Sequence, residues 1–159
     1  MSGYHTAQIC KNGHLITAYA DEYIDSCKQF CTECGAKTIT CCSGCNTPIR
    51  GKAREYGYLG TLQIPAYCHN CGQPYPWTES ALNAANTLIQ EDELLNEQEK
   101  QQFKETLPDL VVLSPTPSTQ LAATRFKRFI VKAAKPTGEA VKSIIADIAS
   151  ETIKKTLGM

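Results

Sequence analysis

The stretch "CTECGAKTITCCSGC", residues 31–45, contains five cysteines within fifteen residues. Two Cys-x-x-Cys pairs stand out in it, Cys31/Cys34 and Cys42/Cys45. In such a pair the chain makes a tight knuckle, and both thiolates point at one zinc ion about 2.3 Å from each sulfur. The stretch therefore predicts a fold that is built around bound metal.

Two further ligand pairs flank this stretch. Cys68 and Cys71 form a third Cys-x-x-Cys knuckle downstream, and Cys10 and His14 stand four apart upstream in "ICKNGH". Three knuckles also share a residue type after their second cysteine, one that tolerates a left-handed backbone: Gly35, Asn46 and Gly72. Because zinc in small modules takes four ligands as two local pairs, four pairs predict two Zn²⁺ ions per chain.

The four pairs can be joined sequentially, as a cross-brace, or nested with the two middle pairs together. We favour sequential pairing, because loop closure costs least for neighbours in sequence. The first expected site is then Cys10, His14, Cys31 and Cys34, and the second is Cys42, Cys45, Cys68 and Cys71. Cys41 adjoins Cys42, so the sequence leaves open which of the two is the ligand.

The segments "ICKNGH", "FCTECGAKTITCCSGCNTPIRG" and "PAYCHNCGQPYPW" resemble an uncharacterised bacterial family of small proteins with an N-terminal double zinc ribbon. The resemblance covers residues 1–80 and extends only loosely over the rest of the chain. It implies zinc at the eight ligands named above and implies no catalytic chemistry.

The composition changes abruptly at residue 78, and three segments are expected. Residues 1–77 contain short β-prone runs at 14–20, 37–41 and 54–67, which predict short antiparallel strands. Residues 78–113 carry eight acidic and two basic residues, whereas 114–159 carry three acidic and eight basic ones. These opposite charges predict that the two segments fold onto each other or onto another copy. The expected fold class is a small, metal-built α+β protein, with two tandem zinc ribbons followed by an α-helical C-terminal region.

Helical periodicity predicts two helices in the acidic segment, over 78–95 and from Asn96 to near Pro108. The basic segment, 114–159, reads as an amphipathic helical hairpin, with helices over 118–134 and 139–157. The last helix carries an apolar stripe, which we expect to form a surface for self-association or for a partner: Val141, Ile144, Ile145 and Ile148.

The expected function is that of a zinc-binding, non-enzymatic adaptor with a ribbon recognition head and a helical association tail. No zincin, P-loop or nucleophile-elbow motif occurs, and nine cysteines in paired spacing fit metal better than disulfides. The start "MSGYHTAQIC" lacks the apolar region of a signal peptide, so we expect a cytoplasmic location.

Two alternatives to the adaptor role remain open at this point. The first is a nucleic-acid-binding ribbon, because basic and aromatic residues alternate in "PIRGKAREYGY": Arg50, Lys52, Arg54, Tyr56 and Tyr58. The second is a membrane-acting effector, because "TRFKRFIVK" combines a Phe/Ile face with a basic flank. A protein partner or self-association is nevertheless the favoured expectation.

Overall fold

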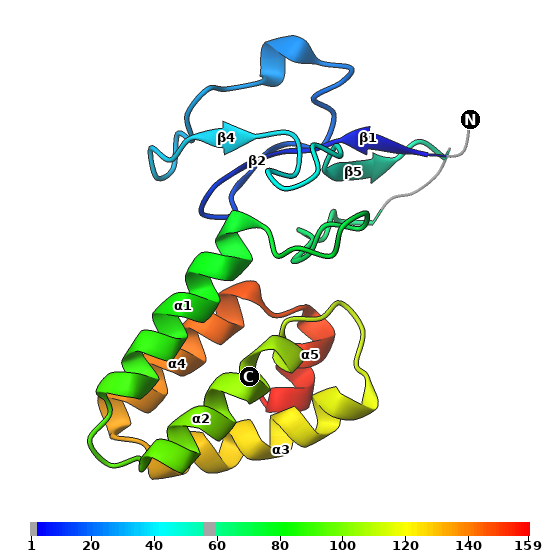
Figure 1. The fold of residues 1–159 in the computed structure, drawn as a ribbon. Coiled ribbons are helices and arrows are strands. Elements are labelled where there is room, and N and C mark those ends of the chain that lie inside the picture. Colours follow the sequence, from blue (N-terminus) through cyan, green and yellow to red (C-terminus); the bar gives the residue numbers. More distant parts are fainter. Residues whose placement is uncertain (1–2, 56–59) are drawn as a thin grey trace. The chain divides into compact units, whose positions relative to one another are not determined.

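The computed structural model describes residues 3–55 and 60–159, and the chain divides into two units between Trp77 and Thr78 (Figure 1). The N-terminal unit consists of short strands and turns, and the C-terminal unit is helical. The structure is therefore a small α+β protein with short antiparallel strands at its N-terminus, as the sequence predicted.

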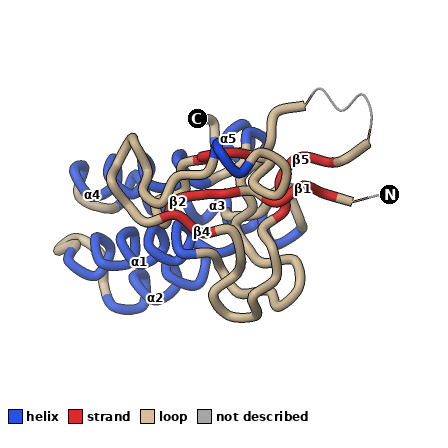
Figure 2. Tube along the Cα trace, turned by 90° about the horizontal axis from the view of Figure 1, so that it is seen from above, coloured by secondary structure: helices blue, strands red, loops and turns tan. Residues whose placement is uncertain are grey.

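The strands of the N-terminal unit are two to four residues long: β1 (Tyr4–Thr6), β2 (Gln8–Cys10), β3 (Leu15–Thr17), β4 (Thr38–Ile39) and β5 (Arg50–Ala53). One antiparallel sheet pairs β1 with β5 (Figure 2), and a second has the order β3-β2-β4. A single 3-10 turn, η1 (Ile24–Ser26), lies in the loop between β3 and β4. These strands hold the ligand-bearing turns beside one another.

The apolar interior of this unit is small. It consists of Ala7, Ile9, Ile49, Tyr75 and Trp77, together with two of the cysteines. The Tyr75 and Trp77 rings stack with centroids 4.8 Å apart, and the Trp77 indole donates to the Pro65 carbonyl at 2.9 Å. So small a core buries little apolar surface, and metal ligation has to contribute to folding.

The strand expected over 54–67 is wrong for the part of it that is described. Residues 54–55 and 60–67 contain no strand, and only Tyr67 makes an isolated bridge, to Pro74. The apolar side chains there pack locally and do not form part of a sheet, since Leu62 and Ile64 lie against the small interior.

The C-terminal unit is formed by α1 (Pro76–Glu91), α2 (Glu97–Thr106), the 3-10 turn η2 (Leu107–Leu110), α3 (Pro117–Lys132), α4 (Lys135–Ile148) and α5 (Glu151–Leu157). Side-chain caps start three of these helices. Asn96 forms a capping box with Glu99, Thr116 forms one with Thr119, and the Ser150 hydroxyl accepts from the Ile153 amide. The predicted start of α2 after Asn96 is confirmed.

One apolar core joins the acidic and the basic segments of the helical unit. The Phe103 ring packs against Phe126 and Phe129, with centroids 5.8 and 4.1 Å away. Lys132 and Glu99 form an ion pair across the two segments. The two segments that differ in charge are thus parts of a single unit.

The apolar stripe of the last long helix lies inside this core, and its assignment as an association surface is corrected. Val141 is 1% exposed and Ile145 is 0% exposed, while Ile144 and Ile148 are partly buried against the same core. The stripe is covered by the neighbouring helices of its own chain, so it does not provide a free docking face.

The single helix predicted over 139–157 is also wrong. Ala149 has an extended backbone with ψ 146°, and the chain restarts as α5 at the Ser150 cap. This break shifts the helical phase, so that Ile153 is buried and Thr152 is exposed.

The helix face of Phe126 and Phe129, which suggested membrane contact, is also covered by other parts of the chain. Phe126 and Phe129 are both buried in the helical core. Among the residues that the structure describes, no helix combines the length and apolar character needed to cross a bilayer.

Candidate metal centres

Three knuckles of the N-terminal unit repeat one local structure. In each, the first cysteine's amide donates to the carbonyl five residues on: Cys31 to Ala36, Cys42 to Thr47 and Cys68 to Gln73, all at 2.8 Å. The residue before the first cysteine forms a bridge seven residues on: Phe30 with Lys37, Cys41 with Pro48 and Tyr67 with Pro74. Each knuckle is thus a small hairpin that presents two thiols at its tip.

The residue after each second cysteine is left-handed, as predicted. Gly35, Asn46 and Gly72 have φ values of 73°, 60° and 75°. Their amides donate back to the carbonyls of Cys31, Cys42 and Cys68 at 2.8–2.9 Å. Because an L residue with a Cβ rarely adopts this conformation, glycine or asparagine is needed at these positions.

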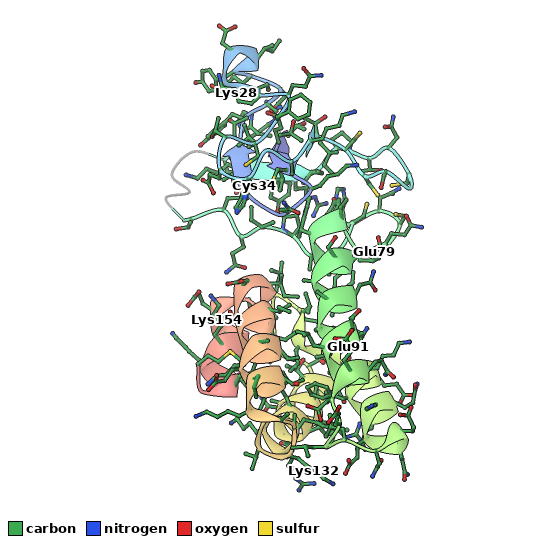
Figure 3. The ribbon with its side chains drawn as sticks, turned by 90° about the vertical axis from the view of Figure 1, so that its left-hand side faces the viewer. Lys28, Cys34, Glu79, Glu91, Lys132 and Lys154 are labelled. Atoms are coloured by element: carbon green, nitrogen blue, oxygen red, sulfur yellow. The ribbon has the colours of Figure 1, made fainter. Side chains whose placement is uncertain are left out.

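The first cluster brings together Cys10, His14, Cys31 and Cys34. Cys10 ends β2, and the Cys10 amide donates to the His14 carbonyl at 3.0 Å, which closes the turn between β2 and β3. Pairing of Cys10 with Thr38 in the β2–β4 ladder places this turn beside the knuckle that carries Cys34 (Figure 3).

The second cluster brings together Cys42, Cys45, Cys68 and Cys71. The amide of Ile49 donates to Thr40 and the amide of Tyr75 donates to Ala66, which closes the two knuckles at their bases. The structure therefore assembles both sites in the sequential arrangement, with neither a cross-brace nor a nested pair among these ligands.

The ligand atoms are spaced as a zinc tetrahedron requires. Bonds of about 2.3 Å to sulfur and about 2.0 Å to nitrogen imply tetrahedral edges of about 3.8 Å between sulfurs and about 3.5 Å between sulfur and nitrogen. The Sγ–Sγ distances are 3.8 Å for Cys10 and Cys34, 3.7 Å for Cys42 and Cys71, and 3.6 Å for Cys45 and Cys68. His14 Nδ1 lies 3.5 Å from Cys10 Sγ and 3.6 Å from Cys31 Sγ. These five distances match the edges of a zinc tetrahedron, and the four ligand atoms of each cluster all lie within 4.8 Å of one another.

Polar groups around the clusters orient the ligands. Glu33 Oε2 lies 3.6 Å from His14 Nε2, the ring nitrogen that does not face the cluster. Asn12 Nδ2 donates to Cys34 Sγ at 3.4 Å, and the Thr47 hydroxyl lies 3.2 Å from Cys45 Sγ. Carboxylates behind a ligating histidine fix its tautomer and ring orientation.

Hydrogen bonds favour the thiolate form at two of the ligands. The Ala36 amide, with help from Asn12, lowers the pKa of Cys34 to about 6. The Thr47 hydroxyl and amide likewise lower the pKa of Cys45 to about 6. Burial instead raises the pKa of Cys10. Since zinc binds the thiolate, these hydrogen bonds favour metal binding at Cys34 and Cys45.

The remaining cysteines and histidines lie outside both clusters. Cys41 Sγ contacts Asn46 Oδ1 at 3.2 Å, so Cys42 is the residue in the cluster. Alignment of the three knuckles predicts this from sequence, because Cys41 takes the bridging position of Phe30 and Tyr67. Cys27 Sγ faces the Ala20 carbonyl at 3.8 Å, and His69 is exposed.

The residues proposed for nucleic-acid binding are only partly available. Arg54 forms an ion pair with Asp21 and also donates to the Tyr4 carbonyl. Arg50 lies over the Tyr4 ring, 4.7 Å from its centroid, and Lys52 is half-buried on β5. Tyr56 and Tyr58 lie outside the described residues.

Two four-ligand clusters of cysteine and histidine on short antiparallel strands, followed by helices, define a small zinc-binding protein with a double zinc-ribbon unit. The chain belongs to the bacterial family described as "uncharacterized protein conserved in bacteria (DUF2321)", which it matches over residues 3–157. The match confirms the resemblance inferred from the cysteine motifs and carries it through the helical unit. Comparison with curated proteins and with solved structures found no match.

Proposed function

We propose that the protein is a non-enzymatic zinc-binding adaptor whose N-terminal unit is a rigid recognition head. The observation that carries this proposal is the closed ligand set of each cluster. Four side chains of the chain itself converge at each site, with every ligand atom within 4.8 Å of the others. A catalytic zinc site keeps a position for water or substrate, whereas four protein ligands are typical of structural zinc.

The loop between β3 and β4 exposes large side chains that would suit a protein partner. Tyr23, Ile24 and Phe30 are 55%, 75% and 54% exposed, and they come from one short stretch of chain. We call these three residues the head patch. Large apolar and aromatic side chains that remain exposed are typical of protein interfaces.

The loop that carries the head patch is held in place by the sheet. The Gln8 side chain accepts from the Lys28 amide at 2.9 Å and donates to the Lys28 carbonyl at 3.0 Å. The Tyr19 carbonyl accepts from the amides of Glu22 and Tyr23. A preorganised loop loses little conformational entropy on binding, which favours its use as a recognition surface.

The test is an affinity purification with matched variants. Ile24→Asp/Phe30→Asp should lose the bound proteins of the native chain and keep two zinc ions. Val131→Asp, which adds a charge at an exposed apolar residue of the helical unit, is the control and should retain them. Identical bound proteins for the native chain and the head-patch variant would contradict the proposal.

Nucleic acid is the second candidate for the binding partner of the N-terminal unit, and one specific observation favours it. The β1–β5 ribbon presents the Arg50 guanidinium over the Tyr4 ring, with Lys52 two residues further on. Such a combination can contact phosphates and stack bases. Salt-dependent binding of single-stranded RNA that is lost in Arg50→Ala/Lys52→Ala would favour this candidate. Arg54→Ala is the control, because Arg54 already pairs with Asp21.

A further inference from the structure

A groove of about 440 Å³ lies between α2 and α3 in the helical unit. Leu121, which is 52% exposed, contributes apolar surface to its lining, and the buried Phe129 lies beneath it. Arg125 and Arg128 line the α3 side. Figure 1 shows α2 and α3 running side by side. The groove thus combines apolar contact area with two guanidinium groups.

The positive charge of the groove is not neutralised within the chain. Helix α3 contains no acidic residue. Arg125 and Arg128 form no ion pair with any residue that the structure describes. The acidic residue in the lining, Glu99, is already paired with Lys132. Because guanidinium forks bind carboxylates in a bidentate manner, the groove is suited to a segment with carboxylates and an apolar side chain.

The chain itself displays such a segment at 91–97, "EDELLNE", between α1 and α2. Leu94 is 63% exposed, and the exposed Glu91 and Glu93 flank it without an ion pair to any described residue. We call residues 91–97 the acidic corner. Its shape is fixed by Asp92, whose carboxylate accepts from the amides of Leu94, Leu95 and Ala134 at 2.9, 3.1 and 2.9 Å.

The acidic corner does not fill the groove of its own chain. Asp92 fixes it to Ala134, at the turn between α3 and α4, and Glu91 and Glu93 make no ion pair with Arg125 or Arg128. A symmetric contact of one α3 face with another is disfavoured, because it would place like charges together. The acidic corner of a different chain would complement each groove in charge and in apolar contact.

We propose that the groove between α2 and α3 binds the acidic corner of a second copy of this chain. Leu94 then contacts the exposed Leu121, and the carboxylates of the corner bind the two unpaired arginines. Both surfaces belong to the same unit, so a two-fold pair forms the contact twice. This inference goes beyond the recognition role of the zinc unit and does not depend on it.

The experiment measures the mass of the zinc-loaded full chain by sedimentation and light scattering over a range of concentrations. At low salt the mass should exceed the 17.4 kDa of one chain, and it should fall toward that value as salt screens the contact. Arg125→Glu/Arg128→Glu should weaken association by about tenfold or more, and Glu91→Lys/Glu93→Lys should do the same. Mixing the two variants should restore it, since each reversed surface then faces its complement.

The matched control is a charge reversal elsewhere on the helical unit. Lys142→Glu/Lys155→Glu reverses two exposed charges outside the groove and should leave association unchanged. Helical circular dichroism and two zinc ions per chain must be retained in every variant that is compared. A monomer at all concentrations, or a mixture of the two reversed variants that stays monomeric, overturns the proposal. Binding of a monomeric native chain to phosphatidylglycerol vesicles, but not to phosphatidylcholine vesicles, would assign the groove to an anionic lipid surface and overturns it equally.

Discussion

At the scale of single residues, each zinc ligand belongs to one cluster, so its removal should affect one metal ion. We predict that Cys68→Ser reduces the zinc content from two ions to one and leaves the Cys10/His14/Cys31/Cys34 cluster loaded. Elemental analysis gives the number, and cadmium NMR of the substituted protein identifies which site remains. Cys41→Ser is the control and should keep both ions, because Cys41 contacts Asn46 outside the cluster. Loss of the ion held by Cys31 and Cys34 would instead indicate a cross-brace.

Asp92 gives a second residue-level prediction, which concerns pH. Burial acts to raise the pKa of Asp92, but hydrogen bonds from the Thr137 side chain and three backbone amides outweigh it and lower that pKa below 3.8. A carboxyl group with a lowered folded-state pKa stabilises the fold above its unfolded pKa, and this contribution is lost as the pH falls through the folded value. The stabilisation from Asp92 should therefore be complete at neutral pH, begin to fall at about pH 4, and be lost as the pH falls further through the lowered folded-state pKa.

Asp92→Asn tests this directly. Both Asp92 oxygens accept amide protons, so an amide NH₂ would face a backbone donor, and we expect a loss of about 2–3 kcal/mol at pH 7. Thermal unfolding of the helical signal, compared with the native chain from pH 7 to pH 3, should show the difference shrinking with acid. Glu93→Gln, at an exposed neighbour, should have little effect. A pH-independent difference would mean that Asp92 acts only through its shape.

At the scale of elements, the features that could be predicted from the sequence are those determined by local hydrogen bonds. The knuckles could be predicted because spacing and the residue after the second cysteine determine a closed set of backbone hydrogen bonds. The start of α2 followed from a capping residue and its partner three positions on. The break at Ala149 was missed although Ser150 followed by Glu151 is a cap signal, because the apolar periodicity on either side concealed it.

Tertiary contacts could not be predicted in the same way. The helix predicted to begin at residue 139 in fact begins at Lys135, so Gly138 lies within α4, where an added Cβ would come 3.0 Å from the Ile130 carbonyl. The apolar stripe of α4 was visible in the sequence, but periodicity alone does not distinguish a face covered by its own chain from one that awaits a partner. Only the assembled core decides between these two cases.

The burial of that stripe determines the expected effect of Ile145→Asp. Ile145 is fully buried in the helical core, so a carboxylate there would be desolvated without a partner. We predict that the helical unit unfolds or becomes molten while both zinc ions remain bound. Circular dichroism, limited proteolysis and zinc analysis of one sample measure both parts. Ile145→Val, which removes one methylene, should cost only about 1 kcal/mol. A folded helical unit with altered association would restore the stripe as a docking surface.

At the scale of the whole molecule, the charge pattern was informative only in part. Opposite charges in 78–113 and 114–159 predicted that the segments meet, and they share one core. However, among the described residues Lys132–Glu99 is the ion pair that joins them, and most of the remaining charges stay on the surface. The pattern therefore describes the outer faces of the helical unit more than its interior, which apolar packing holds together.

The two units should respond differently to the removal of zinc. The apolar core of the N-terminal unit lies between Ala7 and Trp77 and includes two zinc-cluster cysteines, whereas the core of the helical unit runs from Ala85 to Leu157 and includes none. Structural zinc contributes apparent binding free energies of about 10–16 kcal/mol in small zinc-finger peptides, which exceeds what so small an apolar interior can supply. We predict that a strong chelator unfolds the N-terminal unit while the helical signal persists. Hydrogen exchange resolved by peptide should show fast exchange only in the N-terminal unit, and added zinc should restore its protection. Simultaneous loss of protection in both units would show that the helical core depends on the metal-built one, and would refute the division into two independently stabilised units.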